Sequence, residues 1–251
     1  MQTAAMVDAL EREGNQLADS ASRISLDARI PTCPDWSLRD LLRHVGGVHH
    51  WAADHIRQPT DRIANVPDLR ELFGDWPDDD VLIDWYRSEL SGLVKALRAA
   101  PSDLQTATFL ANDGPLNFWA RRQMHEATIH RIDVQLAGGS NDPVPASQAA
   151  DGIDEMLTGF AVRRHVKFRS AEPRHIVIAP DDSEIRWTLT VTDQPLVVDR
   201  QVAPRADTDV RGSCDVIFRV LWNRLPSTAA AIEGDAGLID QFKEAVQIRW
   251  N

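Results

Sequence analysis

Residues 121–133 read RRQMHEATIHRID and place a carboxylate and an imidazole, Glu126 and His130, four positions apart. The surrounding segment, residues 116–136, is followed by Gly138–Gly139, a pair that commonly follows the carboxy-terminal end of a helix. On a helix, residues four apart share one face, with their Cβ atoms about 5–6 Å from each other. Glu126 and His130 can therefore hold one cation from a rigid backbone.

A third ligand has to come from another helix, and His44 is the best candidate. It lies in a second predicted helix, residues 38–56, that also contains an interior Gly46–Gly47 pair. Its neighbours on this helix are apolar: Leu41, Leu42, Val45 and Val48. The imidazole is therefore expected to face inward, and the glycine pair indicates close approach by another helix or by a ligand.

Two histidines and one glutamate leave a fourth coordination position open, which is the pattern of a catalytic zinc site. A metal held in this way lowers the pKa of a bound water or thiol and polarises a carbonyl group. His125 lies roughly 100° around the helix from Glu126, so we expect it to be a bystander. Arg131 and Asp133 either orient the ligands or are surface charges.

The metal-binding residues lie in a predicted four-helix bundle that spans residues 1–142. Helical spacing of apolar residues and helix-end signals mark four segments: residues 3–22, 38–56, 81–99 and 116–136. The polar, proline-bearing segment 59–78 is predicted to be a loop. Four amphipathic helices joined by loops are typical of a bundle.

After a connecting helix, the residue pattern changes from mainly helical to one that includes several predicted β-strands. Residues 143–164 form this connection, with the helix itself at about 147–163. Strands are predicted at residues 174–179, 184–192, 195–202 and 209–212, and helices at 213–225 and 236–246. Residues 165–251 are therefore expected to form a smaller α+β domain, and the fold class of the chain is α+β.

Composition excludes several classes of protein. The chain has 251 residues, 43% hydrophobic and 26% charged, with a net charge of −11, as expected for a folded protein that repels nucleic acids and anionic membranes. No segment is long and apolar enough to span a membrane, and the first twenty residues do not resemble a secretory signal. Two distant cysteines, Cys33 and Cys214, cannot build a disulfide framework, so a reducing cytoplasmic location is expected.

Three blocks of sequence resemble the mycothiol-dependent maleylpyruvate isomerase family. They are TCPDWSLRDLLRHVGGVH at residues 32–49, RRQMHEATIHRID at 121–133, and VRGSCDVIFRVLWNRL at 210–225 followed by IEGD at 232–235. The resemblance implies a DinB-like metal-binding bundle followed by a domain similar to sterol carrier proteins.

The resemblance also implies a site and a chemistry. In the family, a histidine on the second helix and the Glu and His of an E-x-x-x-H turn hold zinc, which corresponds to His44, Glu126 and His130. Another divalent metal such as nickel is an alternative. Mycothiol, the small thiol of actinobacteria, would be the cosubstrate, and its thiolate would add to a conjugated double bond so that the bond can rotate before elimination. Arg224 is the nearest match to a carboxy-terminal arginine that assists with the anionic substrate.

Three hypotheses follow for the function. The first is a zinc-dependent isomerase or thiol transferase that acts on a small electrophile with mycothiol. The second is a metal-dependent hydrolase that uses zinc-bound hydroxide, and the third is a regulatory module that binds a metal or ligand without catalysis. A maleylpyruvate isomerase must hold two carboxylates, for which Arg121, Arg122 and Arg224 are candidates, although Arg121 and Arg122 could equally be surface charges.

Overall fold

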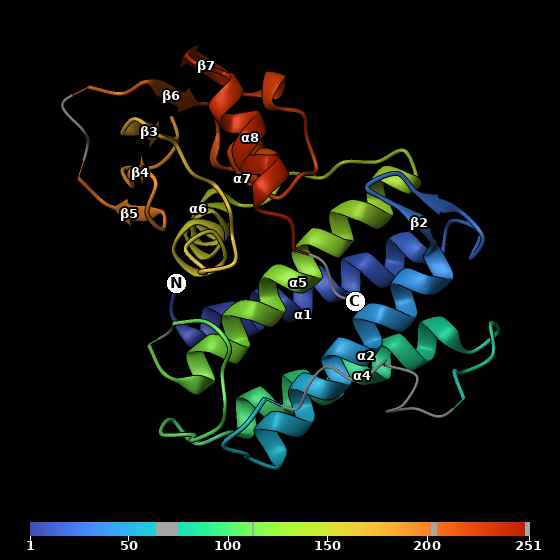
Figure 1. Ribbon diagram of the computed structural model, residues 1–251. Helices are drawn as coiled ribbons and strands as arrows, with labels where there is room; N and C mark the ends of the chain where they lie inside the picture. Colours follow the sequence, from blue (N-terminus) through green and yellow to red (C-terminus); the bar gives the residue numbers. More distant parts are fainter. Residues whose placement is uncertain (64–74, 112, 202–204, 249–251) are drawn as a thin grey trace. The chain divides into compact units, whose positions relative to one another are not determined.

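The computed structural model divides into two compact units, Met1–Asp142 and Pro143–Asn251, each of which is described by itself (Figure 1). The structure describes residues 1–63, 75–111, 113–201 and 205–248. Most of the loop predicted over residues 59–78 lies outside the described residues, as does the last residue of the strand predicted at 195–202.

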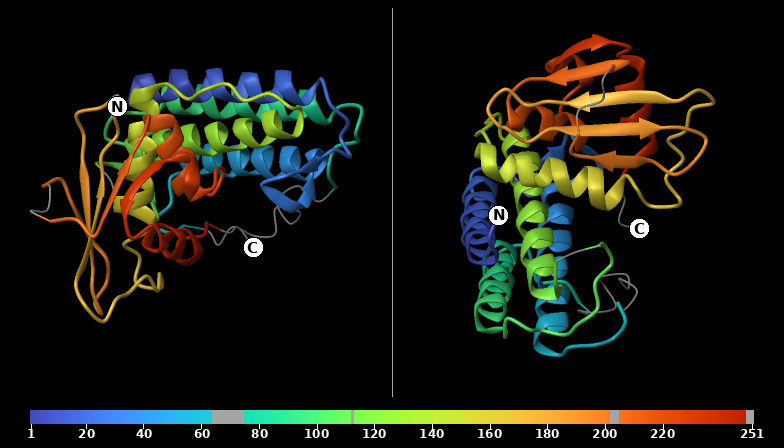
Figure 2. Two further views of the ribbon diagram at one scale, coloured as in Figure 1. Left: turned by 90° about the horizontal axis from the view of Figure 1, so that it is seen from above. Right: turned by 90° about the vertical axis from the view of Figure 1, so that its left-hand side faces the viewer.

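The first unit is a bundle of four long helices. They are α1 (Thr3–Ala21), α2 (Leu38–Arg57), α4 (Leu82–Ala99) and α5 (Pro115–Ala137). The helices lie side by side along their lengths (Figure 2), with α1 against α4 and α5 and with α2 against the same two helices. The predicted bundle is confirmed, because each amphipathic segment forms one of these helices.

Two apolar clusters fill the bundle, and several buried polar side chains lie between them. Along α5, one cluster reaches Ala127 and the other includes Val134. Along α2, the corresponding positions are Trp51 and Val45. His130 belongs to neither cluster, yet only 6% of its surface is exposed. The middle of this core is therefore polar, which requires hydrogen-bond partners for each buried group.

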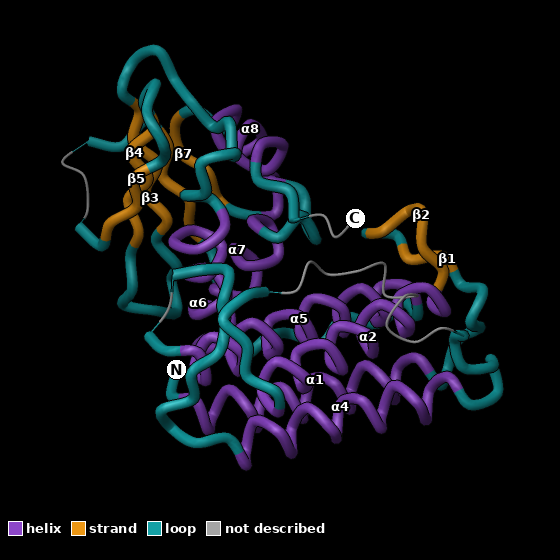
Figure 3. The backbone as a smooth tube through the Cα atoms, turned by 60° about the horizontal axis from the view of Figure 1, so that its bottom comes forward, coloured by secondary structure: helices purple, strands orange, loops and turns teal. Residues whose placement is uncertain are grey.

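A short hairpin leads into α2 at one end of the bundle. Strands β1 (Arg29–Ile30) and β2 (Cys33–Ser37) pair in antiparallel fashion, and α2 begins directly after β2 (Figure 3). Ser37 and Asp40 cap the helix reciprocally, because each side chain bonds the backbone N–H of the other residue. This hairpin was not predicted from the sequence.

The interior glycine pair of α2 marks a close approach, as predicted. A Cβ atom on Gly46 would lie 2.4 Å from Cζ3 of Trp85, on α4. Only glycine leaves room for this indole ring against the helix backbone. The absence of a side chain at position 46 therefore lets the indole of Trp85 lie against the backbone of α2.

The second unit contains a five-stranded mixed sheet. Its order is β5 (Val197–Asp199), β4 (Trp187–Val191), β3 (Arg174–Ile178), β6 (Thr208–Arg211) and β7 (Ala231–Gly234). Only β3 and β6 pair in parallel among these strands. Strand β7 was not predicted, because its four residues, AIEG, carry little β-type patterning.

Helices complete this unit. Helix α6 (Ala146–Asp154) continues as a π-helical segment (Glu155–Phe160), and α7 (Cys214–Leu221) and α8 (Gly237–Ala245) follow the strands, with a short 3₁₀ turn (Ser227–Ala229) before β7. Helices α6 and α7 pack against each other on one side of the sheet (Figure 2). The predicted α+β class is confirmed. No helix in the described part of the chain is both long and apolar enough to cross a membrane.

Candidate metal centre

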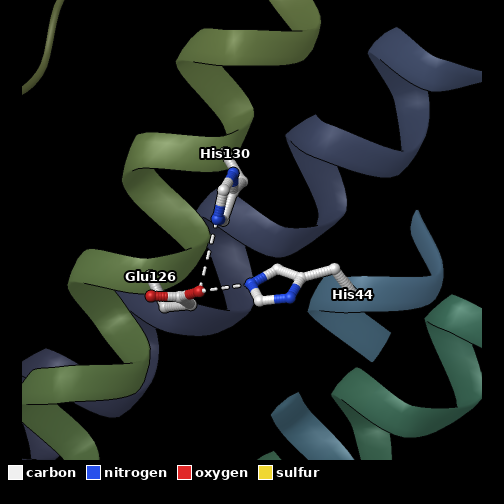
Figure 4. Close-up of side chains that lie close together, drawn as sticks. All are labelled: His44, Glu126 and His130. Atoms are coloured by element: carbon white, nitrogen blue, oxygen red, sulfur yellow. Dashed lines mark hydrogen bonds and ion pairs between the residues drawn. The ribbon is translucent and has the colours of Figure 1, made fainter. Parts of the chain in front are cut away.

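The structure brings together the three side chains that the sequence nominated. His44 on α2 points at Glu126 and His130 on α5, as Figure 4 shows. The Nε2 atoms of His44 and His130 lie 3.2 and 3.3 Å from Oε1 of Glu126. One ligand atom from each residue lies within 4.8 Å of the other two, and all three residues are buried. Their role as ligands stays a prediction.

The separations between these atoms suit a small divalent cation. Zinc bonds to nitrogen and oxygen at about 2.0–2.1 Å, so two ligands of a tetrahedral site lie roughly 3.3 Å apart. Both nitrogen–oxygen separations at Glu126 are close to that value. The donor set of two imidazoles and one carboxylate also matches what zinc prefers. The residues present therefore fit the metal that the resemblance implies.

Asp133 fixes the orientation of the His130 ring. Its Oδ2 lies 2.9 Å from Nδ1 of His130, and its Oδ1 accepts a hydrogen bond of 2.5 Å from the hydroxyl of Thr32. The Sγ of Cys33 lies 3.9 Å from Oδ2 of the same carboxylate. A histidine whose Nδ1–H is held by a carboxylate presents the lone pair of Nε2 to a metal. The predicted orienting role of Asp133 is thus supported by geometry.

Two arginines that could have been surface charges are buried. Nη2 of Arg122 donates to Oε2 of Glu126 over 2.9 Å, and Arg122 is 2% exposed. Arg131 is also buried, but its guanidinium donates to Glu13 over 2.6 Å and also to Gln135. The surface alternative is wrong for Arg122, Arg131 and Asp133. Arg131 ties α5 to α1 and does not contact the three candidate ligands through these bonds.

The electrostatics of the trio favour an ionised Glu126 and a protonated His130. Burial alone would raise the pKa of Glu126, but hydrogen bonds from His130 and His44 and the charge of Arg122 hold that pKa well below its ordinary value. Burial would lower the pKa of His130, but its bonds to Asp133 and Glu126 outweigh burial and raise the pKa to about 9. Burial lowers the pKa of His44, although Glu126 opposes the change.

One wall of the site is aromatic and comes from the hairpin. The ring of Trp36, on β2, lies 4.7 Å from the ring of His44 and 6.1 Å from that of His130. Trp36 is half-buried, so it borders both the imidazoles and the solvent. Sequence reasoning did not assign it to the site. The only signal was its position in the TCPDW stretch, four residues after Thr32.

The other histidines near the site have different roles. His49 is buried and bonds Gln123, and burial lowers its pKa to about 4. His50 is partly exposed and bonds Glu89 on α4. His125 is fully buried but is not part of the trio, as its position on the helix predicted. Within the described residues, the trio is the group of three or more potential ligands that can share a cation.

Arg224 lies in the second compact unit, three residues after α7. It is half-buried, and its Nη1 donates to the carbonyl oxygen of Trp222 over 2.9 Å. The preceding residue, Asn223, has a left-handed backbone with φ of 61°. The assignment of Arg224 to an anionic substrate stays a prediction, and so does that of Arg121.

Comparisons with known proteins agree with this description. Residues 7–135 match the mycothiol maleylpyruvate isomerase N-terminal domain, and residues 147–241 match the MDMPI C-terminal domain. A crystal structure of the mycothiol-dependent maleylpyruvate isomerase matches over 90% of each chain, with a TM-score of 0.64 and 14% identity. A histidine-to-alanine mutant of that enzyme matches over 93% of each chain, with a TM-score of 0.67 and 14% identity. No curated protein matches. At this identity the structural likeness describes the fold.

Proposed function

This chain belongs to the family of the mycothiol maleylpyruvate isomerase N-terminal domain, and from that premise we propose that it is a metal-dependent isomerase with a thiol cosubstrate. Zinc is the preferred metal and mycothiol the preferred thiol. The substrate is a small anionic electrophile whose double bond is conjugated to a carbonyl group. The proposal extends to Arg224 as a residue that assists in binding the anion.

The observation that carries the proposal is the convergence of three buried donor atoms from two helices. Nε2 of His44, Nε2 of His130 and Oε1 of Glu126 face one point in the core of the bundle. Burying two imidazoles and a carboxylate together is costly unless they are paired or bind a cation. Three protein ligands leave a fourth position for a substrate or cosubstrate, as in catalytic zinc sites.

The surrounding residues prepare the trio for this task. Asp133 holds the Nδ1–H of His130, so that Nε2 is the atom left to bind a cation. Thr32 in turn holds the carboxylate of Asp133 and links the hairpin to α5. Trp36, on the hairpin, packs against the two imidazole rings.

A divalent metal held by His44, Glu126 and His130 would lower the pKa of a bound thiol, so that a thiolate would be present at neutral pH. A thiolate that adds to the conjugated double bond converts it into a single bond, which rotates. Elimination then restores the double bond in the other geometry and returns the thiol. The reaction needs no net oxidation or hydrolysis, because the thiol is recovered unchanged.

The test is isomerisation of maleylpyruvate by the zinc-loaded full chain, measured with and without mycothiol. We expect turnover only when both zinc and the thiol are present. Hydrolysis of an ester or amide without the thiol would instead favour the zinc-hydroxide hypothesis. A protein that binds zinc but shows neither reaction, and whose melting temperature falls on chelation, would favour the regulatory module.

Variants of the trio test the site separately from the reaction. Glu126→Gln and His130→Ala should remove most of the bound zinc, as measured by metal analysis of the purified protein. His125→Ala should remove less, because His125 is not part of the trio. His50→Ala is the matched control on α2, where its imidazole pairs with Glu89. Equal zinc loss in all four variants would contradict the assignment.

A further inference from the structure

The two oxygens of the Glu126 carboxylate have different partners, and Arg122 binds one of them. Its Nη2 holds Oε2 over 2.9 Å, while Oε1 faces Nε2 of His44 and Nε2 of His130 at 3.2 and 3.3 Å. We infer that Arg122 is a positioning residue that keeps Glu126 a one-oxygen ligand and so holds the cation to four ligands. This inference rests on the proposed function, because it needs a cation at the trio.

Stability does not explain why the pair is buried. Arg122 and Glu126 are four residues apart on α5, and the side chains are 2% and 4% exposed. Arg122 precedes Glu126 along the helix, and a positive residue before a negative one is the weaker order for a helical pair of this spacing. Removing two charges from water also costs at least as much as their attraction returns in many proteins. A role in shaping the carboxylate accounts for the arrangement better.

The second oxygen of a carboxylate decides how a metal is bound. With both oxygens free, a carboxylate can bind in a bidentate manner, which suits larger cations with six to eight ligands such as Ca²⁺. Catalytic zinc sites instead use three protein ligands and keep one position for a water or substrate. Arginine is always charged and its planar donors match a carboxylate edge, so it can occupy Oε2 at any physiological pH. The inferred consequence is a small, open coordination shell.

Cobalt(II) reports this coordination without any measurement of activity. Four-coordinate cobalt(II) absorbs visible light much more strongly than the six-coordinate ion. The metal-free full chain is loaded with Co²⁺, alone and with 2-mercaptoethanol as the thiol probe, and zinc affinity is measured by competition with a chromophoric chelator. We expect strong absorption for the wild type. Arg122→Met should weaken this absorption and lower zinc affinity about 10–100-fold.

Arg131→Met is the matched control. Arg131 is a second fully buried arginine on α5, but its ion pair joins Glu13 on α1 and not a member of the trio. The variant should lower the melting temperature while it keeps the wild-type cobalt spectrum. In a Glu126→Ala background, Arg122→Met should not lower the residual zinc affinity further, because the carboxylate through which Arg122 acts is absent.

Each outcome decides the inference. A wild-type cobalt spectrum and zinc affinity in Arg122→Met would overturn it, as would an equal spectral change in Arg131→Met or a further loss of affinity in the Glu126→Ala background. If Arg122→Met does not fold, the wild-type spectrum still tests the inference, because weak six-coordinate absorption contradicts a cation that is held to four ligands. Failure of the wild type to bind either metal would instead overturn the proposed function.

Discussion

Replacing Asp133 by asparagine should weaken zinc binding while the bundle stays folded. Asp133 is fully buried, and its Oδ2 accepts the Nδ1–H of His130 over 2.9 Å. Asparagine keeps the size of the side chain but removes the negative charge and offers an N–H₂ group in place of one oxygen. The amide oxygen can still accept the Nδ1–H, but the imidazole loses the charged partner that raises the basicity of Nε2.

Two independent arguments give the same magnitude for this loss. A hydrogen bond to a charged group contributes about 1.5–3 kcal/mol. Loss of an outer partner of a metal-binding histidine typically lowers metal affinity about 10–100-fold, which corresponds to about 1.4–2.8 kcal/mol at 1.4 kcal/mol per tenfold. We therefore expect zinc affinity to fall about 10–100-fold in Asp133→Asn. Thr32→Val removes the hydroxyl that holds Oδ1 and should cause a smaller loss, because the carboxylate keeps its charge.

The assay is competition for zinc between the protein and a chromophoric chelator, with thermal unfolding followed by circular dichroism. Asp8→Asn is the control, because Asp8 is an exposed carboxylate that pairs only with Arg98 among the bonds described. If Asp133→Asn and Asp8→Asn bind zinc equally well, the orienting role of Asp133 is refuted.

Two further predictions concern stability. Gly14→Ala should lower the unfolding free energy by about 1–3 kcal/mol despite a gain in helix propensity, because its Cβ would lie 2.6 Å from both Cδ atoms of the buried Leu90. Gly92→Ala, whose Cβ would meet only the flexible tip of Arg57 at 3.1 Å, should leave the unfolding free energy unchanged or raise it. Urea titration of both variants measures these changes. Asp40→Asn should remove an acid-sensitive share of stability. Burial opposes the shift, but the hydrogen bonds from Ser37 lower the pKa of Asp40 in the folded state. That contribution is complete above the unfolded pKa of about 3.9 and disappears as the pH falls through the lower folded value. Wild type and variant should therefore differ in urea midpoint at pH 7 and converge in strong acid, and a constant difference would contradict the capping argument.

The helices of the bundle and most strands of the second unit were predictable because their signals are local. The apolar spacing of residues 38–56 and the glycines after residue 137 mark helix ends that the structure shows at Arg57 and Ala137. Strand β7 and the hairpin before α2 were not predicted. Both are short, and their strands are stabilised by pairing with neighbouring strands. The spacing of apolar residues along the chain does not indicate such pairing.

Some residues of the candidate site could likewise be predicted from the sequence, and others could not. Glu126 and His130 could be paired from sequence, because a helix fixes the separation of residues four apart. His44 required a guess about which face of another helix turns inward, and the structure brings its Nε2 to 3.2 Å from Glu126. Arg122 lies four residues before Glu126, so its helix face could be inferred in the same way, but its burial and its bond to Oε2 of Glu126 could not. The position of Trp36 relative to the trio could not be inferred either, because it depends on how the hairpin packs against the bundle.

The sequence by itself determined the helical segments, the pairing of Glu126 with His130 on one helix face, and the family, because these depend on spacing along the chain. Only the tertiary structure decided that Arg122 is buried against Glu126, that Arg131 turns to Glu13, and that Trp36 covers two imidazoles. The physical reason is that spacing along a helix shows which side chains can meet, whereas burial and the partners offered by other elements decide which contacts form. Neighbouring arginines such as 121 and 122 look alike in sequence, although one is partly exposed and the other lies in the core.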